Sequence, residues 1–403
     1  YFRGRKDLFK GLAIEKLEKD WTEYPVLHFD LSDIKKGTVE DFGENVNSSL
    51  ASMEGEFGIA KTSDNPGTRL KDLVERIYNK TGKQVVLLFD EYDAPLLTVL
   101  HDPERLETMR TELQSFYSPI KKLDPYLRFV FITGITKFSQ LSIFSQLNNL
   151  NNISMLPQYA AMCGITIKEL EDNFQEGIAV LAEKYHYSHK QVIDKLLYHY
   201  DGYHFAEDSE GVLNPFSLLS AMNNRKFNNY WFSTGTPTFL VNMMRKFHTD
   251  LTEIDGSKAM QEDFDAPTEN MHNVLPLFYQ SGYLTIKDYN PRSGMYTLGY
   301  PNEEVKVGLM RILIPFYVQS DPVPASNACW DISEALMDGD IDKALAAARS
   351  YFASIPYQEN TLKDAPTTEG HFTAMLYVMF SFLNRYVYSQ VRNAKGRLDI
   401  LIK

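Results

Sequence analysis

The sequence has little cysteine and no apolar run long enough to cross a membrane. Its 403 residues include two cysteines, Cys163 and Cys329, which are too few for a disulfide framework. A membrane-spanning helix needs about 20 consecutive apolar residues, and the apolar runs here are much shorter. Residues 1–6 contain no initiator Met and no signal-peptide pattern. We therefore expect a protein of the reducing cytoplasm with no membrane partner.

An excess of positive charge is also missing. The chain carries 41 Lys and Arg against 53 Asp and Glu, a formal net charge of -12. This balance disfavours general electrostatic binding of nucleic acid, so any DNA contact should be local. Hydrophobic residues make up 44% and charged residues 23%, which is ordinary for globular proteins, and the length favours two or three domains.

A further absence concerns phosphate binding. A phosphate-binding loop has the pattern Gly-x-x-x-x-Gly-Lys-Ser/Thr, whose backbone N–H groups and helix N-terminus cradle the phosphates. No match occurs in these 403 residues. The nearest segment is Gly-Glu-Phe-Gly-Ile-Ala-Lys-Thr at 55–62, where Ala60 replaces the second glycine and no apolar strand precedes. We interpret residues 55–62 as an ordinary loop.

The most informative stretch is an apolar run that leads directly into carboxylates. Residues 85–89 predict a strand buried on both faces of a parallel sheet, and Asp90, Glu91 and Asp93 follow it. Ligands of parallel sheets bind at the carboxyl ends of the strands. In nucleotide hydrolases one acid at this position holds Mg²⁺, and the next often polarises the attacking water. The alternative interpretation is a buried strand that happens to be followed by acidic residues.

Strand and helix signals alternate over the first 165 residues. The predicted strands cover 26–30, 85–89 and 129–132, and the predicted helices lie near 70–77 and 106–117. This alternation is typical of βαβ units with a parallel sheet. Asp30 ends the first strand, and Thr-Gly-Ile-Thr-Lys at 133–137 follows the third. We therefore expect hydroxyls, acids and a cation at one edge of the sheet, as phosphate chemistry requires.

Several motifs occur in a fixed order along the chain. They are Phe-Asp-Glu-Tyr-Asp-Ala-Pro-Leu at 89–96, Thr-Gly-Ile-Thr-Lys-Phe-Ser at 133–139, Phe-Ser-Gln-Leu-Asn-Asn-Leu at 144–150, Tyr-Asp-Gly-Tyr-His-Phe at 200–205, Asn-Pro-Phe-Ser at 214–217, Tyr-Trp at 230–231, Gly-Tyr-Leu at 282–284 and Gly-Tyr-Pro-Asn-Glu-Glu-Val at 299–305. In this order they resemble the AAA-ATPase-like family of bacterial proteins, abundant in gut Bacteroidetes. The resemblance spans nearly the whole chain.

The resemblance implies ATP and Mg²⁺ as cofactors and ATP as a binding partner. Asp90 would bind Mg²⁺, usually through water, and Glu91 would orient or deprotonate the hydrolytic water. Thr136 and Lys137 occupy the place of a γ-phosphate sensor, and Thr133 could do the same job. The alternatives are a hydroxyl that caps the strand end and, for Lys137, an exposed charge.

The same family places its phosphate-binding loop just upstream of a segment like residues 1–9. The resemblance therefore implies that half of the nucleotide site is missing from these 403 residues through truncation or disorder. Alone, this chain is expected to bind ATP weakly or not at all.

The middle of the chain changes to helical signals. Thr166 with Glu169 and Ser188 with Gln191 are capping-box signatures that predict two helices of a lid or bundle. Residues 277–298 predict the order helix, strand, turn, strand, which is the outline of a winged helix. The aromatic residues beside the turns at 200–205 and 214–217 are explained by packing.

The last hundred residues predict a separate unit. A helix is expected at 342–353, a second helix opened by Glu369, and a hairpin around the turn at 393–396. This order resembles the opening of the PD-(D/E)XK nuclease fold. In that fold Asp399 would be the first metal-binding acid, and Glu369 from the helix would be a second acid of the site.

Two features weaken this nuclease interpretation. Gln390 stands where relatives commonly have Glu, and a neutral amide is a poorer ligand for a hard cation. The Glu-x-Lys strand of the fold would lie beyond Lys403. As an alternative, Asp399 is a charged residue on an exposed edge strand.

The sequence thus predicts an α/β protein in three parts. These are a P-loop NTPase-type parallel sheet core at 1–165, a helical lid and winged-helix-like region at 166–310, and the start of a restriction-endonuclease-like domain at 311–403. The expected function is Mg²⁺-dependent ATP binding and hydrolysis coupled to a nucleic-acid task, with DNA bound or cleaved by the C-terminal domain. The alternative is a nucleotide-switched signalling or scaffold protein whose nuclease-like domain only binds partners. The sequence does not predict the oligomeric state.

Overall fold

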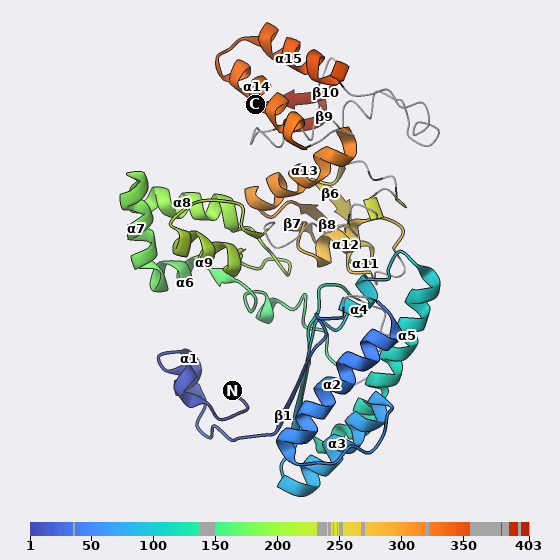
Figure 1. Cartoon of the computed structure of the whole chain (residues 1–403). Helices are drawn as coiled ribbons and strands as arrows, with labels where there is room; N and C mark the ends of the chain where they lie inside the picture. Colours follow the sequence, from blue (N-terminus) through green and yellow to red (C-terminus); the bar gives the residue numbers. More distant parts are fainter. Residues whose placement is uncertain are drawn as a thin grey trace. The chain divides into compact units, whose positions relative to one another are not determined.

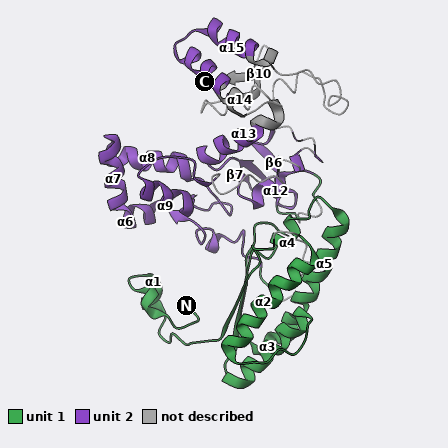
Figure 2. Cartoon of the chain, in the orientation of Figure 1, with its two compact units in different colours: residues 1–151, 265–272 green, residues 152–264, 273–403 purple. Residues whose placement is uncertain are grey.

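A computed structural model describes most of the chain. The described residues are 1–34, 37–137, 150–231, 240, 243–244, 246–247, 249, 253–266, 271–318, 322–354, 380, 387–393 and 396–402. The chain divides into two compact units (Figure 2). The first comprises Tyr1–Asn151 and Asp265–His272, and the second comprises Asn152–Phe264 and Asn273–Lys403.

A three-stranded parallel sheet forms the centre of the first unit. It is built from β1 (Val26–Asp30), β2 (Val85–Asp90) and β3 (Leu127–Ile132), in the order β1-β2-β3. The side chains of β2 are buried on both faces, which explains why its sequence is continuously apolar. The three predicted strands and their parallel arrangement are therefore confirmed.

Three helices of the first unit, α2 (Val39–Phe57), α3 (Pro66–Thr81) and α5 (Pro103–Tyr117), pack against one another beside the sheet (Figure 1). The shorter elements are η1 (Lys6–Phe9), α1 (Ala13–Leu17), α4 (Ala94–Leu97) and η2 (Ser118–Tyr126). Phe29 and Phe89 from adjacent strands stack with ring centroids 5.1 Å apart, and Phe116 of α5 meets both edge-on. These rings join the helices to the sheet.

The helix ends of the first unit follow local sequence rules. Thr38, Asn65 and Asp102 each accept a hydrogen bond from the amide three residues later. Gly58 and Gly82 adopt left-handed backbone conformations just after α2 and α3. The predicted helices around 70–77 and 106–117 are confirmed.

The interpretation of residues 55–62 as a loop was partly wrong. Residues 55–57 form the last turn of α2, and only the remainder of the segment is non-helical. The α2 helix itself has no counterpart among the predicted helices. Its apolar residues Phe42, Val46, Leu50 and Met53 recur at helical spacing and are buried, so the signal was present in the sequence.

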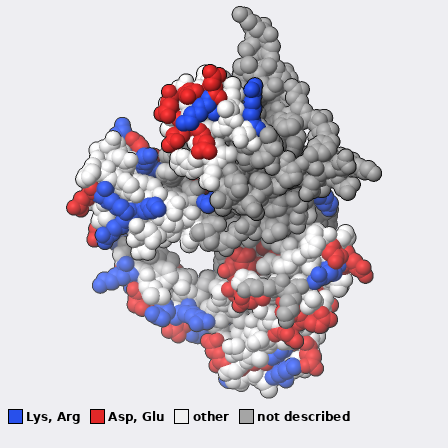
Figure 3. Space-filling model, turned by 45° about the horizontal axis from the view of Figure 1, so that its top comes forward, with Lys and Arg blue, Asp and Glu red and all other residues white. Residues whose placement is uncertain are grey.

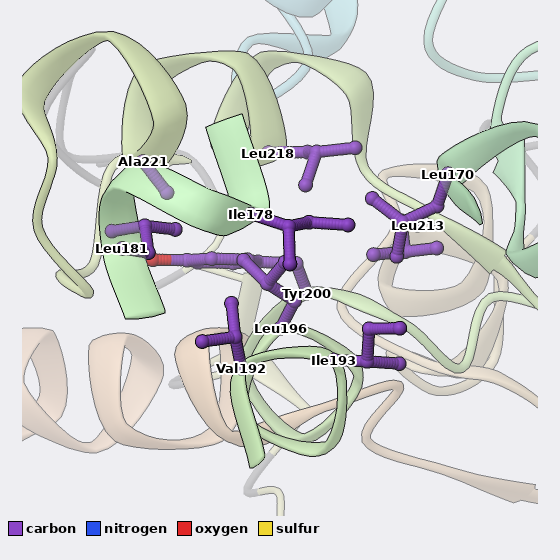
Figure 4. Packing of buried hydrophobic residues seen from close by; sticks show 10 residues of the cluster. All are labelled: Leu170, Ile178, Leu181, Val192, Ile193, Leu196, Tyr200, Leu213, Leu218 and Ala221. Atoms are coloured by element: carbon purple, nitrogen blue, oxygen red, sulfur yellow. The ribbon is translucent and has the colours of Figure 1, made fainter. Parts of the chain in front are cut away.

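The second unit begins with a group of helices around an apolar core (Figure 4). These helices are α6 (Ile167–Asn173), α7 (Gln175–Tyr185), α8 (His189–Tyr200) and α9 (Pro215–Asn224), and a short antiparallel pair joins β4 (Ile165–Thr166) to β5 (Val212–Leu213). Both predicted capping boxes, at Thr166 and Ser188, are confirmed. Asn214 caps α9, with Pro215 at its first position.

A three-stranded antiparallel sheet follows. It has the order β6 (Ser257–Ala259), β8 (Met295–Gly299), β7 (Thr285–Asn290), and it lies with α11 (Gln261–Phe264) and α12 (Leu275–Gln280) in the second unit. The predicted order helix, strand, turn, strand is confirmed by α12, β7 and β8. The predicted outline lacked β6, and the winged-helix assignment stays a prediction.

The remaining described elements are helices followed by a hairpin. The helices are α13 (Glu303–Val318), α14 (Pro322–Met337) and α15 (Ile341–Ser354), and β9 (Val387–Asn393) pairs antiparallel with β10 (Gly396–Ile402). The predicted helix at 342–353 and the hairpin are confirmed. Glu369 and the helix that it was expected to open lie outside the described residues. The predicted domain limits and the nuclease fold stay predictions.

No described helix combines the length and the apolar character needed to span a membrane.

Candidate active site

The ends of β1 and β2 bring two acids side by side. Asp30 and Asp90 are register partners in neighbouring parallel strands. Both side chains are exposed, and Asp30 Oδ1 accepts a hydrogen bond from the Ser32 amide (2.9 Å). Hydrogen bonds from Ser32 hold the pKa of Asp30 below its ordinary value. Asp30 is therefore a fixed negative charge beside Asp90.

Thr133 joins the end of β3 to the same acidic edge. Its amide donates to the carbonyl of Phe89 (2.8 Å), which continues the ladder between β3 and β2. Its hydroxyl donates to Asp90 Oδ1. The structure thus places Thr133 and Asp90 together, as the sequence predicted for polar residues that follow neighbouring strands.

Glu91 lies in a sharp turn directly after β2. Its backbone has a φ of 53°, in the left-handed region that non-glycine residues adopt at a cost. The side chain is partly exposed, and burial raises the pKa of its carboxyl, with further increases from the charges of Asp93, Asp90 and Asp30. A carboxylate with a raised pKa is better suited to accept a proton than an ordinary surface glutamate.

The side chain of the third acid, Asp93, points into the interior of the protein. Its side chain is fully buried. Oδ1 accepts from the Ile135 amide (3.1 Å), and Oδ2 accepts from the Thr136 amide and hydroxyl (both 2.6 Å). Burial raises the pKa of Asp93, while the hydrogen bonds from Thr136 lower it in part. Asp93 therefore holds the loop after β3 and does not face solvent with the other acids.

The two remaining sensor candidates have other partners. Thr136 is buried, and its hydroxyl donates to Asp93. The Lys137 ammonium forms an ion pair with Asp265 (2.7 Å), which belongs to the same unit despite its distance in sequence. Of the three predicted candidates, Thr133 is the one whose hydroxyl bonds to Asp90. The sensor roles themselves stay predictions.

The oxygen donors at this edge fit Mg²⁺. Among the described residues, no group of three or more His, Cys, Asp or Glu side chains could hold a metal ion. Mg²⁺ does not need such a cage, because it commonly binds through one or two carboxylates, several waters and substrate phosphates. The exposed Asp90, with Glu91 beside it, offers this kind of site.

The second predicted site is described only in part. Asp399 lies in β10 and Gln390 in β9, on neighbouring antiparallel strands. Leu398 pairs with Val391 and Ile400 pairs with Ser389, so the register places Gln390 opposite Asp399. The sequence showed the glutamine but not this pairing. Glu369, the other acid predicted for this site, lies outside the described residues.

Comparison with known proteins identifies the family of the chain. Residues 1–144 match the family model described as Predicted AAA-ATPase, so this part is an AAA-ATPase-like domain. The uncharacterized protein in vnfD 5'region of Azotobacter chroococcum mcd 1 is 32% identical over 413 residues, which cover 100% of this chain and 76% of the relative. The chain belongs to the same family as this Azotobacter protein. No solved structure matches.

The comparisons confirm the expected AAA-ATPase-like resemblance for residues 1–144. A Bacteroidetes type and a nuclease-like domain stay predictions.

Proposed function

We propose that this protein binds and hydrolyses ATP with Mg²⁺ at the carboxyl edge of the β1-β2-β3 sheet. The observation that carries the proposal is the hydrogen bond from Thr133 to Asp90, next to Glu91 with its raised pKa. This edge lies within the part of the chain that matches the AAA-ATPase model. Two acids and a hydroxyl lie close together at this edge, which supports the proposal because nucleotide hydrolases use such groups.

Each residue has a separate task in this proposal. Asp90 would hold Mg²⁺ through water, and the bound ion would neutralise charge on the phosphates. Glu91 would orient the attacking water and accept its proton. Thr133 would coordinate the ion through its hydroxyl oxygen or donate its hydroxyl hydrogen to the γ-phosphate. We assign no phosphate-binding loop within these 403 residues, because the sequence contains no such motif.

The finer proposal is that ATP hydrolysis serves a nucleic-acid task through a PD-(D/E)XK-like C-terminal domain. The β9–β10 hairpin with Asp399 supports it. Gln390 opposite Asp399 favours the alternative, in which this domain binds partners without cleaving nucleic acid. On the described part of the face in Figure 3, Lys and Arg side chains lie among Asp and Glu side chains and form no broad basic surface.

The ATPase proposal is tested with Glu91→Gln in the protein expressed from its complete reading frame. Removal of a general base typically lowers turnover by about 10²–10⁴-fold, so Mg²⁺-dependent phosphate release should fall within that range. Glu104→Gln is a matched control, because Glu104 is exposed on α5 of the same unit. Equal turnover by wild type and Glu91→Gln would refute the assignment of Glu91.

The C-terminal proposal needs its own experiment. Wild type and Asp399→Ala are incubated with Mg²⁺ and single- and double-stranded DNA and RNA. Cleavage by wild type that Asp399→Ala abolishes supports the nuclease. If wild type cleaves none of these substrates, the non-catalytic binding module is the better description.

A further inference from the structure

We propose that Asp93 is a positioning residue of the site. Its carboxylate fixes residues 134–136, the loop after β3, so that the Thr133 hydroxyl stays on Asp90. This inference rests on the proposed ATPase function for its catalytic readout. Its structural readout, the hydrogen exchange of the loop amides, does not depend on any activity.

The acids that follow β2 divide into an exposed group and a buried one. Asp90 is exposed and Glu91 partly exposed, whereas Tyr92 and Asp93 are buried. The left-handed turn at Glu91 separates the two pairs. Two of the three acids therefore face the solvent edge, and the third faces the interior.

Both carboxylate oxygens of Asp93 accept hydrogen bonds from the loop after β3. Oδ1 accepts from the Ile135 amide, and Oδ2 accepts from the amide and hydroxyl of Thr136. Two of these donors are backbone N–H groups, so the carboxylate fixes the path of the chain and not only one side chain. A hydrogen bond to an ionised carboxylate is stronger than one between neutral groups. Asp93 is thus committed to the loop and is not free to bind a metal ion.

Tyr92, the residue before Asp93, holds the same loop. Its hydroxyl donates to the carbonyl of Thr136 (2.8 Å), and its amide donates to the carbonyl of Thr133 (3.0 Å). Gly134 packs directly onto this pair. A Cβ added there would lie 2.3 Å from Asp93 Oδ1 and 2.5 Å from Tyr92 Cδ1.

These contacts connect the buried acid to the exposed edge. Thr133 immediately precedes the fixed residues, and its own carbonyl is held by Tyr92. If the Asp93 bonds are lost, Thr133 gains freedom to leave Asp90. Asp93 would therefore affect ATP turnover without contact with ATP, Mg²⁺ or water.

The test compares Asp93→Asn with wild type by amide hydrogen exchange and by ATPase kinetics. The asparagine side chain has the same shape as aspartate. In either orientation, however, its NH₂ group replaces an oxygen that accepts a hydrogen bond from Ile135 or Thr136. We expect the Ile135 and Thr136 amides to exchange about tenfold to a hundredfold faster, as expected when hydrogen bonds to a charged group are lost. We expect kcat to fall by about tenfold or more while KM for ATP changes by less than about threefold, because ATP itself is not contacted.

Two further variants test the same hydrogen bonds if Asp93→Asn does not fold. Thr136→Val removes one of the three bonds, and Thr136→Ser retains the hydroxyl that forms it. We expect Thr136→Val to increase exchange and lower kcat, and Thr136→Ser to behave as wild type. Unchanged amide protection in Asp93→Asn or Thr136→Val would overturn the positioning role, as would lost protection with an unchanged kcat.

A wild-type protein without ATPase activity would give a different result. In that case the proposed function fails, while the exchange experiment still decides whether Asp93 fixes the loop. The two failures are therefore distinguishable.

Discussion

The Thr133 hydroxyl donates a hydrogen bond to Asp90 Oδ1, and this bond joins the ends of two neighbouring parallel strands. Asp30 lies on the other side of Asp90 in the ladder. The bond leaves the rest of the Asp90 carboxylate exposed at the edge of the sheet. A change in the position of Thr133 would therefore directly alter the hydrogen bonding of Asp90, the proposed Mg²⁺ ligand.

Replacement of Thr133 should test this bond. Thr133→Val keeps the shape of the side chain but removes the hydroxyl donor to a carboxylate. Loss of such a bond corresponds to about a tenfold to a hundredfold fall in kcat if it operates in the transition state. Thr133→Ser should retain most of the activity. Thr108→Val serves as the control, because the Thr108 hydroxyl only donates to a carbonyl within α5. Equal rates for Thr133→Val and wild type would exclude Thr133 from the reaction.

The raised pKa of Glu91 predicts a particular pH dependence of turnover. Glu91 must be ionised to accept a proton, and burial and its acidic neighbours make it protonate at a higher pH than an ordinary glutamate. Because kcat/KM reports the pKa values of the free enzyme, the acidic limb of the plot of kcat/KM against pH should lie above pH 4.5, the ordinary value. Asp30→Asn removes one of the neighbouring charges and should shift the limb to lower pH. A shift to higher pH would contradict this assignment.

The same pKa shift predicts the stability of Glu91→Gln. A folded-state pKa above the unfolded value means that ionisation of Glu91 opposes folding as pH rises through the raised pKa. The glutamine variant lacks this penalty. Its free energy of unfolding at pH 7 should equal or exceed that of wild type, and the advantage should vanish in acid. Urea unfolding at several pH values measures the difference, and a clear loss of stability at pH 7 would contradict the prediction.

The parallel sheet and the position of the acids could be predicted because their signals are local. An apolar run such as Val85–Phe89 is compatible with few kinds of secondary structure. The acids that follow it must then lie at the end of the strand. The capping boxes at Thr166 and Ser188 are also complete within four residues. Such signals do not depend on the rest of the chain.

The tasks of the individual acids could not be predicted in this way. Nothing near Asp93 shows that it turns inward, because its donors Ile135 and Thr136 are more than 40 residues away. The partner of Lys137, Asp265, is 128 residues away and has no sequence signal. Spatial neighbours of this kind depend on the folded chain, and they decide which polar residues remain available for chemistry.

A buried ion pair between α2 and α3 should contribute strongly to the stability of the first unit. Arg69 donates to both oxygens of Glu54 (2.7 and 2.6 Å) and to Asn47 Oδ1 (2.8 Å). Removal of one partner leaves a buried charge unpaired, so Glu54→Gln should lower the free energy of unfolding by about 3–5 kcal/mol. The double variant Glu54→Leu with Arg69→Met should recover much of this loss.

The partly exposed pair Lys71 and Glu75 on α3 provides the control for that experiment. Glu75→Gln should change the free energy of unfolding by less than about 1 kcal/mol. Urea unfolding measures both variants. Similar losses in the free energy of unfolding for Glu54→Gln and Glu75→Gln would show that burial does not increase the contribution of the Arg69–Glu54 pair to stability.

His199 predicts a loss of stability of the second unit in acid. Burial lowers the pKa of its imidazole to about 4, from an ordinary value of 6.5, and Lys195 adds to the decrease. The ring stacks on Phe227, and its buried Nδ1 has no hydrogen-bond partner in the described part of the chain. As the pH falls, His199 is protonated in the unfolded chain before it is protonated in the folded protein. The free energy of unfolding should therefore decrease between about pH 6.5 and pH 4, by about 3 kcal/mol at the lower end.

His199→Phe should remove this contribution and keep the stack on Phe227. The measurement is the difference in free energy of unfolding between wild type and variant at pH 7 and pH 4, which cancels the titration of carboxylates common to both. His189→Phe is the control, because His189 is exposed at the start of α8. The difference should move in favour of His199→Phe as the pH falls, since only wild type must protonate a buried ring. A difference that stays constant between the two pH values would show that His199 titrates normally in the folded protein.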